Sequence, residues 1–291
     1  MKISFLAWIA DKFIRKRMRI SEEKVYAQLR DNKTDKSTYI LPKSLKFPRK
    51  IEEKRYGKLQ VFEMPPAKGK TKKIMYIHGG GYVQTFSYFH WVFLIKLCKK
   101  TGCGLTAPNY PLLPRYTYKE SYKEVIDYYK EYIKNNDADN IILAGDSAGG
   151  GFCFSLLQQL RNQKLPLPGK TILISPFVDV QGANKKMSKK DAMVDYMATI
   201  MLGKAWANGD DLKSYEISPL YGNLQNLPPI EIYVGTLEVL HDQCIEVYKK
   251  LKSSGNDVKL YIGKNMGHDY PLLPIPEAKK AIDDMMKFIN K

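Results

Sequence analysis

The sequence predicts an α/β fold in which helices cover both faces of a mostly parallel central sheet. Short, continuously apolar runs alternate with longer stretches of helical periodicity, as in buried parallel strands joined by helices. One apolar run ends in a glycine-flanked serine at residues 145–149, and an earlier one ends in three glycines at 79–81. The chain has 291 residues, 44% of them hydrophobic, which is sufficient for one large domain with a small accessory part.

The N-terminal stretch has an apolar stripe. Phe5, Ile9 and Phe13 follow one another at intervals of four residues with Leu6 alongside, which is the spacing of one helix face, and basic residues dominate 15–19. Such a helix can lie on a membrane surface, cover an active site or pack on its own domain, and these alternatives stay open. A signal peptide is not favoured, because no A-x-A site follows and the chain turns basic.

Seven apolar or β-branched runs then predict strands, and the periodic stretches between them predict helices. We expect strands at residues 57–62, 73–77, 103–107, 141–144, 170–174, 230–234 and 258–262. We expect helices at residues 88–100, 121–134, 152–163, 193–206, 239–253 and 276–290. The strand–helix alternation lapses between residues 178 and 215, which we interpret as an insertion into the core.

The G-D-S-A-G stretch at 145–149 predicts a strand, a sharp turn and a helix, with Ser147 at the tip. Gly145 and Gly149 stand where side chains would collide as the chain doubles back. The following helix directs its positive N-terminal end toward negative charge forming on a substrate. The alternative is a glycine-rich turn with a chance serine, because so short a pattern often occurs by chance.

The H-G-G-G-Y stretch at 78–82 directly follows a predicted strand. Consecutive glycines let the backbone approach a ligand with free N–H groups, which suits an oxyanion hole. The alternative is a flexible turn. The order of this stretch and a G-x-S-x-G about 70 residues later favours the catalytic interpretation.

A nucleophilic serine needs a base, and the base needs a carboxylate that fixes its tautomer. Of the four histidines, only His268 lies in a loop just past the last predicted strand, and functional residues gather at the carboxyl ends of such strands. The carboxylate is expected at residues 235–242, after the preceding strand. Glu238 and Asp242 compete for this role, and Glu238 is preferred because it lies in the loop that leaves the strand.

Charge and cysteine content limit the class of protein. The 47 Lys and Arg residues against 30 Asp and Glu residues give a net charge of +17, but the lysines are spread along the chain and no nucleic-acid-binding motif occurs. We therefore expect no nucleic-acid partner. The four cysteines form no C-x-x-C pair, which indicates free thiols in a reducing compartment and a cytoplasmic location. A weak membrane-surface contact through the N-terminal helix and a homodimer stay open.

Seven motifs together resemble those of the hormone-sensitive-lipase-like branch of the α/β-hydrolase superfamily, which includes bacterial carboxylesterases. They are H-G-G-G-Y (78–82), G-D-S-A-G-G (145–150), S-P-F-V-D (175–179), S-P-L (218–220), L-P-P (227–229), G-x-x-E-x-L-x-D (235–242) and G-H (267–268). Each motif is weak, but the combination is specific and spans the chain from about residue 73 to its end.

This resemblance implies an α/β-hydrolase fold with a helical cap over the active site. It implies hydrolysis of short- to medium-chain carboxylic esters without a metal or cofactor. The cap would be built from the N-terminal helices and the insertion. We therefore divide the chain into a cap segment at 1–50, an α/β-hydrolase core at 51–177 and 216–291, and a cap insertion at 178–215.

The resemblance also implies a role for single residues. The nucleophile, base and acid would be Ser147, His268 and Glu238. The oxyanion hole would be formed by the backbone N–H groups of Gly80, Gly81 and Ala148, with Gly79 one residue away. Two departures stand out: many relatives have Asp where this chain has Glu238, and the histidine turn usually continues to Phe, whereas Asp269 follows here.

Two alternatives to a serine carboxylesterase remain open. A hydrolase scaffold can serve as a non-catalytic ligand-binding protein, although such relatives lose a triad residue and this chain has all three. An acyltransferase would use the same triad with an alcohol in place of water. For either enzyme we expect a small-molecule ester as the substrate.

Overall fold

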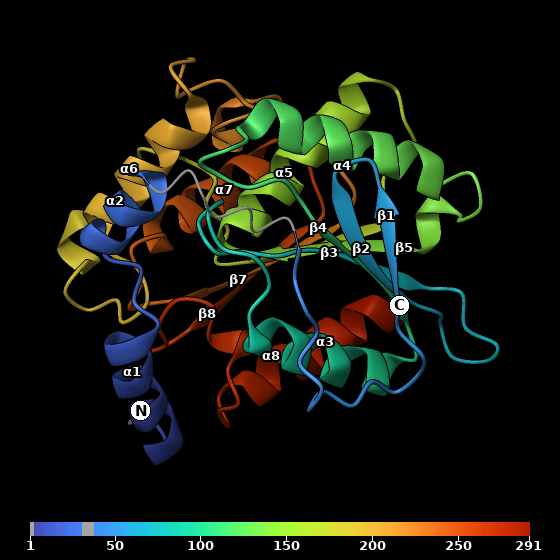
Figure 1. The fold of residues 1–291 in the computed structure, drawn as a ribbon, viewed down its shortest axis with the longest axis horizontal. Coiled ribbons are helices and arrows are strands. Elements are labelled where there is room, and N and C mark those ends of the chain that lie inside the picture. The colour runs from blue at the N-terminus through green and yellow to red at the C-terminus, as the bar shows by residue number, and fades with distance from the viewer. Residues whose placement is uncertain (1–2, 31–37) are drawn as a thin grey trace.

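A computed structural model describes residues 3–30 and 38–291. Within them, eight strands form one sheet in the order β1-β2-β4-β3-β5-β6-β7-β8 (Figure 1). Strands β4, β3, β5, β6, β7 and β8 pair in parallel with their neighbours. Strand β2 pairs antiparallel with β4, and β1 pairs antiparallel with β2. The prediction of a mostly parallel sheet with helices on both faces is therefore confirmed.

The sheet is built from eight short strands. They are β1 (Glu52–Tyr56), β2 (Leu59–Met64), β3 (Lys73–Ile77), β4 (Gly104–Asn109), β5 (Ile141–Asp146), β6 (Lys170–Ile174), β7 (Ile230–Gly235) and β8 (Val258–Gly263). The crossover connections contain α3 (Tyr88–Thr101), α4 (Tyr118–Tyr132), α5 (Ser147–Asn162) and α7 (His241–Ser253), and α8 (Ala278–Asn290) ends the chain.

Both faces of the central strands are buried, because successive side chains of a strand point to opposite faces. In β5, Ile141 and Leu143 pack into one core cluster, and Ile142 and Ala144 into the other. The first cluster lies under α4, α5 and α7, and the second under α3 and α8, which Figure 1 shows on opposite sides of the sheet. This two-sided burial explains the continuously apolar strand sequences.

The N-terminal helices and the insertion are joined beside the carboxyl ends of the strands. They comprise α1 (Phe5–Arg17), α2 (Glu22–Arg30) and α6 (Tyr196–Ala207). Between α1 and α2, Ile20 forms a parallel β-bridge with Val194 of the insertion. Arg19 adds an ion pair of 3.0 Å with Asp195. Two segments far apart in the sequence therefore form one unit.

The apolar stripe of the N-terminal helix faces outward. Phe5, Leu6, Ile9 and Phe13 are exposed, and the buried residues of α1 are Ala7 and Ile14 instead. Of the three roles left open, covering the active site with this stripe and packing it on the domain are therefore excluded.

Two elements escaped the sequence analysis. Strand β1 has the sequence EEKRY, and its exposed edge position removes the apolar pattern by which buried strands are recognised. The expected strand at 57–62 begins two residues later, because Gly57 adopts a positive φ of 53° in the turn from β1 to β2. Helix α2 has one buried residue, Val25, so its period was weak.

In the described part of the chain, every helix is too short or too polar to cross a membrane.

Candidate active site

Ser147 lies at a sharp turn between β5 and α5. Its φ of 49° is unusual for a residue with a side chain and indicates a strained backbone. A Cβ atom on Gly145 would lie 2.6 Å from the carbonyl oxygen of Gly149, and one on Gly149 would lie 2.1 Å from that of Ile77. Glycine is therefore required on both sides of the serine for the chain to reverse over β3.

His268 follows β8 and reaches Ser147 from the neighbouring loop. Its Nε2 atom lies 2.9 Å from the Ser147 Oγ atom, within hydrogen-bond distance. The imidazole is almost completely buried. Residues 121 positions apart are thus brought together, because β5 and β8 end at the same edge of the parallel sheet.

Glu238 lies on the other side of the same imidazole. Its Oε1 atom is 3.7 Å from His268 Nδ1, too long for a hydrogen bond but close enough for an ion pair. Its Oε2 atom accepts hydrogen bonds from the Ser175 hydroxyl at 2.9 Å and from the Gly235 N–H at 3.1 Å. Neither Glu238 Oε1 nor His268 Nδ1 has a closer partner among the described residues, so a small movement would join them.

Asp242, the competing carboxylate, points elsewhere. Its side chain is 60% exposed at the start of α7. It accepts hydrogen bonds from the Asn184 side chain and, at 3.0 Å, from His241 Nδ1. The geometry therefore brings Glu238, and not Asp242, to His268.

The glycine turn after β3 passes beside Ser147. Gly80 and Gly81 have φ values of 99° and 62°, which L-residues rarely adopt. The Gly79 N–H donates a hydrogen bond of 3.0 Å to Asp146 Oδ1, so it is occupied. In the described structure, no hydrogen bond engages the N–H of Gly80 or Gly81. Ala148 lies in the first turn of α5, where backbone N–H groups have no partner within the helix.

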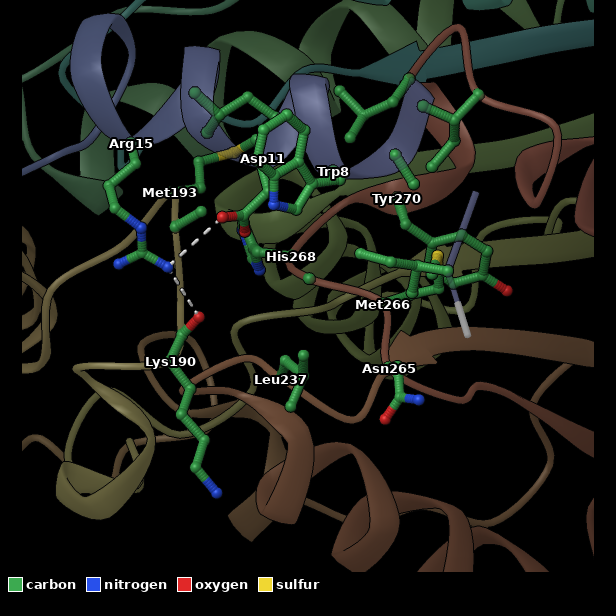
Figure 2. A pocket seen from close by; sticks show the side chains of 17 residues that line it. Trp8, Asp11, Arg15, Lys190, Met193, Leu237, Asn265, Met266, His268 and Tyr270 are labelled. Carbon is green, nitrogen blue, oxygen red and sulfur yellow. Dashed lines mark hydrogen bonds and ion pairs between the residues drawn. The ribbon is translucent and has the colours of Figure 1, made fainter. Parts of the chain in front are cut away.

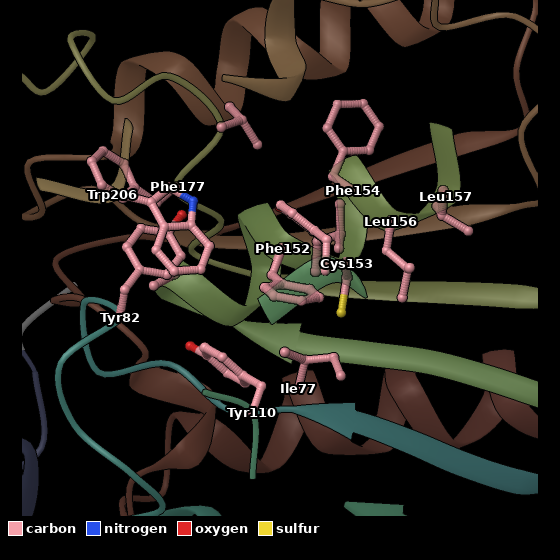
Figure 3. Packing of buried hydrophobic residues seen from close by; sticks show 14 of the residues in the cluster. Ile77, Tyr82, Tyr110, Phe152, Cys153, Phe154, Leu156, Leu157, Phe177 and Trp206 are labelled. Atoms are coloured by element: carbon pink, nitrogen blue, oxygen red, sulfur yellow. The ribbon is translucent and has the colours of Figure 1, made fainter. Parts of the chain in front are cut away.

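The insertion packs directly on this glycine turn. A Cβ atom on Gly81 would lie 2.6 Å from a methyl group of Leu202 in α6. The next residue, Tyr82, stacks on Trp206 with ring centroids 4.0 Å apart and an angle of 6° between the rings. Figure 3 shows these two rings together with Phe177 at the edge of the core. Helix α6 therefore holds the glycine turn from outside.

Asp146 connects the glycine turn to the turn at Ser147. Besides Gly79, it accepts hydrogen bonds from the Tyr76 hydroxyl at 2.6 Å and from His90 Nε2 at 3.1 Å. Burial opposes the charge on this carboxylate, but the histidines and hydrogen bonds around it lower its pKa below the usual value. A charged Asp146 therefore fixes the position of both turns.

A second carboxylate lies close to the imidazole of His268. Asp269 Oδ2 is 3.2 Å from His268 Nε2, on the side facing Ser147. Burial lowers the pKa of His268, but the charges of Asp269, Glu238 and Asp191 outweigh it and raise this pKa well above 6.5. Burial in turn raises the pKa of the Asp269 carboxyl well above its usual value. The His268 imidazole and the Asp269 carboxylate therefore compete for one proton.

Two cavities meet at His268. The first, of about 70 Å³, has Ser147 and Gly80 in its wall together with Met18 and Ile20 of the N-terminal segment. The second, of about 320 Å³, lies beneath α1, as Figure 2 shows. Both are lined by Met193, His268 and Leu273. The N-terminal segment and the insertion thus line the space next to the serine.

Sequence reasoning missed three polar residues around this site. Ser175 connects Glu238 to the histidine loop, because its hydroxyl also accepts the N–H of Asp269 at 3.2 Å. Asp191 accepts the N–H of Val239 at 2.9 Å and so ties the insertion to the segment of Glu238. Ser175 belongs to the S-P-F-V-D motif and Asp269 to the histidine turn, whereas Asp191 lies in the insertion with no sequence signal.

Solved structures resemble this arrangement over most of the chain. A structure from Staphylococcus aureus superimposes with a TM-score of 0.85 at 29% identity, covering 93% of this chain and 92% of that one. A hormone-sensitive lipase from a metagenome library superimposes with a TM-score of 0.77 at 27% identity, covering 84% and 87%. The predicted resemblance to hormone-sensitive-lipase-like enzymes is therefore confirmed at the level of the family.

Curated relatives have names of one kind. An acetyl-hydrolase of Streptomyces hygroscopicus is 28% identical over 233 residues, covering 77% of each chain. A triacylglycerol lipase of Mycobacterium tuberculosis is 26% identical over 224 residues, which are 77% of this chain but 47% of that lipase. These names agree with the predicted class, carboxylic ester hydrolases. A family model described as alpha/beta hydrolase fold matches residues 74–272, more than half of the chain, and the protein therefore belongs to the α/β-hydrolase-fold family.

Proposed function

We propose that this protein is a serine carboxylesterase, with Ser147 as nucleophile, His268 as base and Glu238 as the acid of the triad. The observation on which this depends is the contact of 2.9 Å between Ser147 Oγ and His268 Nε2, with a buried carboxylate on the opposite side of the ring. A serine hydroxyl becomes a strong nucleophile only when a base accepts its proton. The family membership and the names of the relatives support the same class of reaction.

The proposed reaction has two halves. Ser147 Oγ attacks the ester carbonyl carbon while His268 Nε2 takes its proton, and the carbonyl oxygen becomes an oxyanion. His268 then donates the proton to the leaving alcohol, and an acyl-serine remains. Water, deprotonated by His268, attacks the acyl-serine; the bond between the acyl carbon and Ser147 Oγ then breaks, His268 returns the proton to Oγ, and the carboxylic acid leaves. Throughout, Glu238 stabilises the imidazolium from the Nδ1 side.

The oxyanion would be bound by the backbone N–H groups of Gly80, Gly81 and Ala148. Two features support this assignment over one that includes Gly79. The Gly79 N–H is already used by Asp146, and Gly80 lines the cavity beside Ser147. Backbone donors fixed in this way stabilise charge that forms only in the transition state.

The size of the cavity beside Ser147 supports short acyl chains. About 70 Å³ accommodates about five water-sized groups, if each needs 10–15 Å³. The larger cavity beneath α1 could accept a medium-length chain or the alcohol portion, because it also borders His268. We propose that the segments lining these cavities, residues 1–50 and 178–215, act as the cap. Of these, residues 1–2 and 31–37 lie outside the described structure.

A graded series of p-nitrophenyl esters tests this proposal. The wild-type protein should hydrolyse short esters best, and Ser147→Ala should lower kcat by a factor on the order of 10⁶. A fluorophosphonate probe should label Ser147 and no other residue by mass spectrometry. Substantial residual activity in Ser147→Ala, or an adduct elsewhere, would show that another group is the nucleophile. Folded protein without any esterase activity would favour a binding function.

A further inference from the structure

The outward face of α1 is apolar. Phe5, Leu6, Trp8, Ile9 and Phe13 are between 42% and 72% exposed, and Phe5 stacks on Trp8 with ring centroids 5.8 Å apart. Isolated apolar side chains are common on protein surfaces, but five large ones on three turns of one helix form a contiguous patch. We call these five residues the α1 patch.

Both ends of α1 are attached to the body of the protein. At its start, the Ser4 hydroxyl donates to Glu277 Oε2 at 2.9 Å, and the same serine caps the helix. At its end, the Arg15 guanidinium donates to the carbonyl oxygens of Lys189, Lys190 and Asp191 at 3.1–3.3 Å. The inner face is therefore committed to the protein, and the α1 patch stays outside without any unfolding of the helix.

Cations border the α1 patch. Lys12, Lys16 and Arg17 are exposed on the same helix, and its one acidic residue, Asp11, pairs with Arg15 at 3.7 Å. Beyond the end of the helix, Lys189 and Lys190 are exposed on the insertion segment that Arg15 contacts. An apolar helix face bordered by lysine and arginine is typical of helices that lie in the plane of a negatively charged lipid surface.

A second copy of the chain is a poorer occupant. A symmetric dimer through this face would bring the same surface of two chains together. Lys12, Lys16 and Arg17 of one copy would then face those of the other, and each chain has a net charge of +17. Anionic headgroups complement these cations, and the acyl region beneath them can accept the apolar side chains.

We propose that α1 binds the surface of an anionic lipid bilayer, with the α1 patch inserted at the boundary between headgroups and acyl chains. This binding does not depend on the proposed esterase activity. It would, however, place the cavity of about 320 Å³ next to the lipid, since the inner face of α1 forms one wall of that cavity (Figure 2). Trp8 belongs to the patch and also lines this wall.

Trp8 provides an intrinsic reporter for this proposal. The other two tryptophans, Trp91 and Trp206, are completely buried, so a change in their fluorescence on lipid binding is not expected. We expect a blue shift with vesicles of phosphatidylcholine and phosphatidylserine at about 7:3, quenching by brominated lipids in such vesicles, and little change with phosphatidylcholine alone. Raising the salt from about 0.1 M to about 0.5 M should weaken this binding.

Vesicle sedimentation of matched variants tests the two components of the face. Lys12→Gln/Lys16→Gln/Arg17→Gln should weaken binding about 100-fold, because each cation near an anionic surface contributes about one kcal/mol. The control Lys68→Gln/Lys99→Gln/Lys280→Gln removes the same charge from exposed positions elsewhere and should weaken vesicle binding far less. Ile9→Ser/Phe13→Ser should weaken binding at least about tenfold, whereas Ile262→Ser, also an exposed isoleucine, should not.

Several results would overturn the proposal. Equal losses in the test and control variants would mean that net charge alone attracts the protein to vesicles. Equal binding to neutral and anionic vesicles would remove the role of the cations. If Ile9→Ser/Phe13→Ser changed only the sedimentation coefficient of the protein in solution, the patch would be an interface between copies. None of the substituted residues lines either cavity beside His268, so hydrolysis of a water-soluble ester should be unchanged in all these variants, which separates this test from the test of Ser147.

Discussion

Exchange of the Glu238 carboxylate for an amide tests the triad most sharply. In Glu238→Gln the amide oxygen would keep the donors Ser175 and Gly235, because both donate to Oε2. The NH₂ group would then face His268 Nδ1 and require that atom to accept. The proton would consequently sit on Nε2, which must itself accept the proton of Ser147. The variant would hold the base in the wrong tautomer.

The size of this effect follows from the geometry. The same exchange in serine proteases lowers kcat by about 10⁴, or about 5.4 kcal/mol of transition-state stabilisation at 1.36 kcal/mol per tenfold change. We expect a loss of that order, because Glu238 is completely buried and no water can replace its charge. The fold should persist, since glutamine has the same shape and keeps both hydrogen bonds on Oε2.

Asp242→Asn is the matched control. Asp242 lies four residues later on the same segment, is 60% exposed and contacts Asn184 and His241 instead of the triad. Because Asp242 contacts neither Ser147 nor His268, kcat should fall less than about fivefold, and loss of so exposed a pair should lower the free energy of unfolding by less than about 1 kcal/mol. The assay is kcat for p-nitrophenyl acetate, with urea unfolding of each variant. If Asp242→Asn lost more activity than Glu238→Gln, the assignment of the acid would be wrong.

Two further predictions concern the neighbours of this triad. Only neutral His268 can accept a proton, so its raised pKa should place the acidic limb of the kcat/KM profile above the usual histidine value. Asp269→Asn removes the charge that raises this pKa most, and should therefore move the limb to lower pH. A limb that stays in place or moves to higher pH would contradict this prediction. Gly79→Ala should destabilise the protein by about 1–3 kcal/mol in urea unfolding, because its Cβ atom would lie 2.2 Å from the Asp146 carboxylate. Gly69→Ala is the control, because its Cβ atom would have no neighbour within 4 Å and only the positive φ of 76° should cost stability, about 1 kcal/mol. Equal losses of stability in the two variants would argue against a steric cause at Gly79.

The sequence by itself determined the fold class and the chemical character of the site. Continuous apolar runs such as residues 141–144 could only be buried on both faces, and burial on both faces requires covering helices. The glycines on both sides of Ser147 indicated the backbone geometry directly, because only glycine fits where an added Cβ atom would collide with neighbouring backbone. Motifs of this kind are local, and local constraints can be read without knowing what packs against them.

Only the tertiary structure decided how the distant parts meet. Which of Glu238 and Asp242 lies beside His268 depended on the direction of two side chains four residues apart, which no periodicity specifies. The proximity of Asp269 to His268 could not be read from the sequence either, since Asp269 adopts a left-handed conformation with a φ of 55°. The N-terminal stripe showed the same limit: its spacing predicted a helix with an apolar face, but that face points outward and the buried residues are Ala7 and Ile14. Amphipathic spacing defines that a face exists, and packing against the rest of the molecule determines where it points.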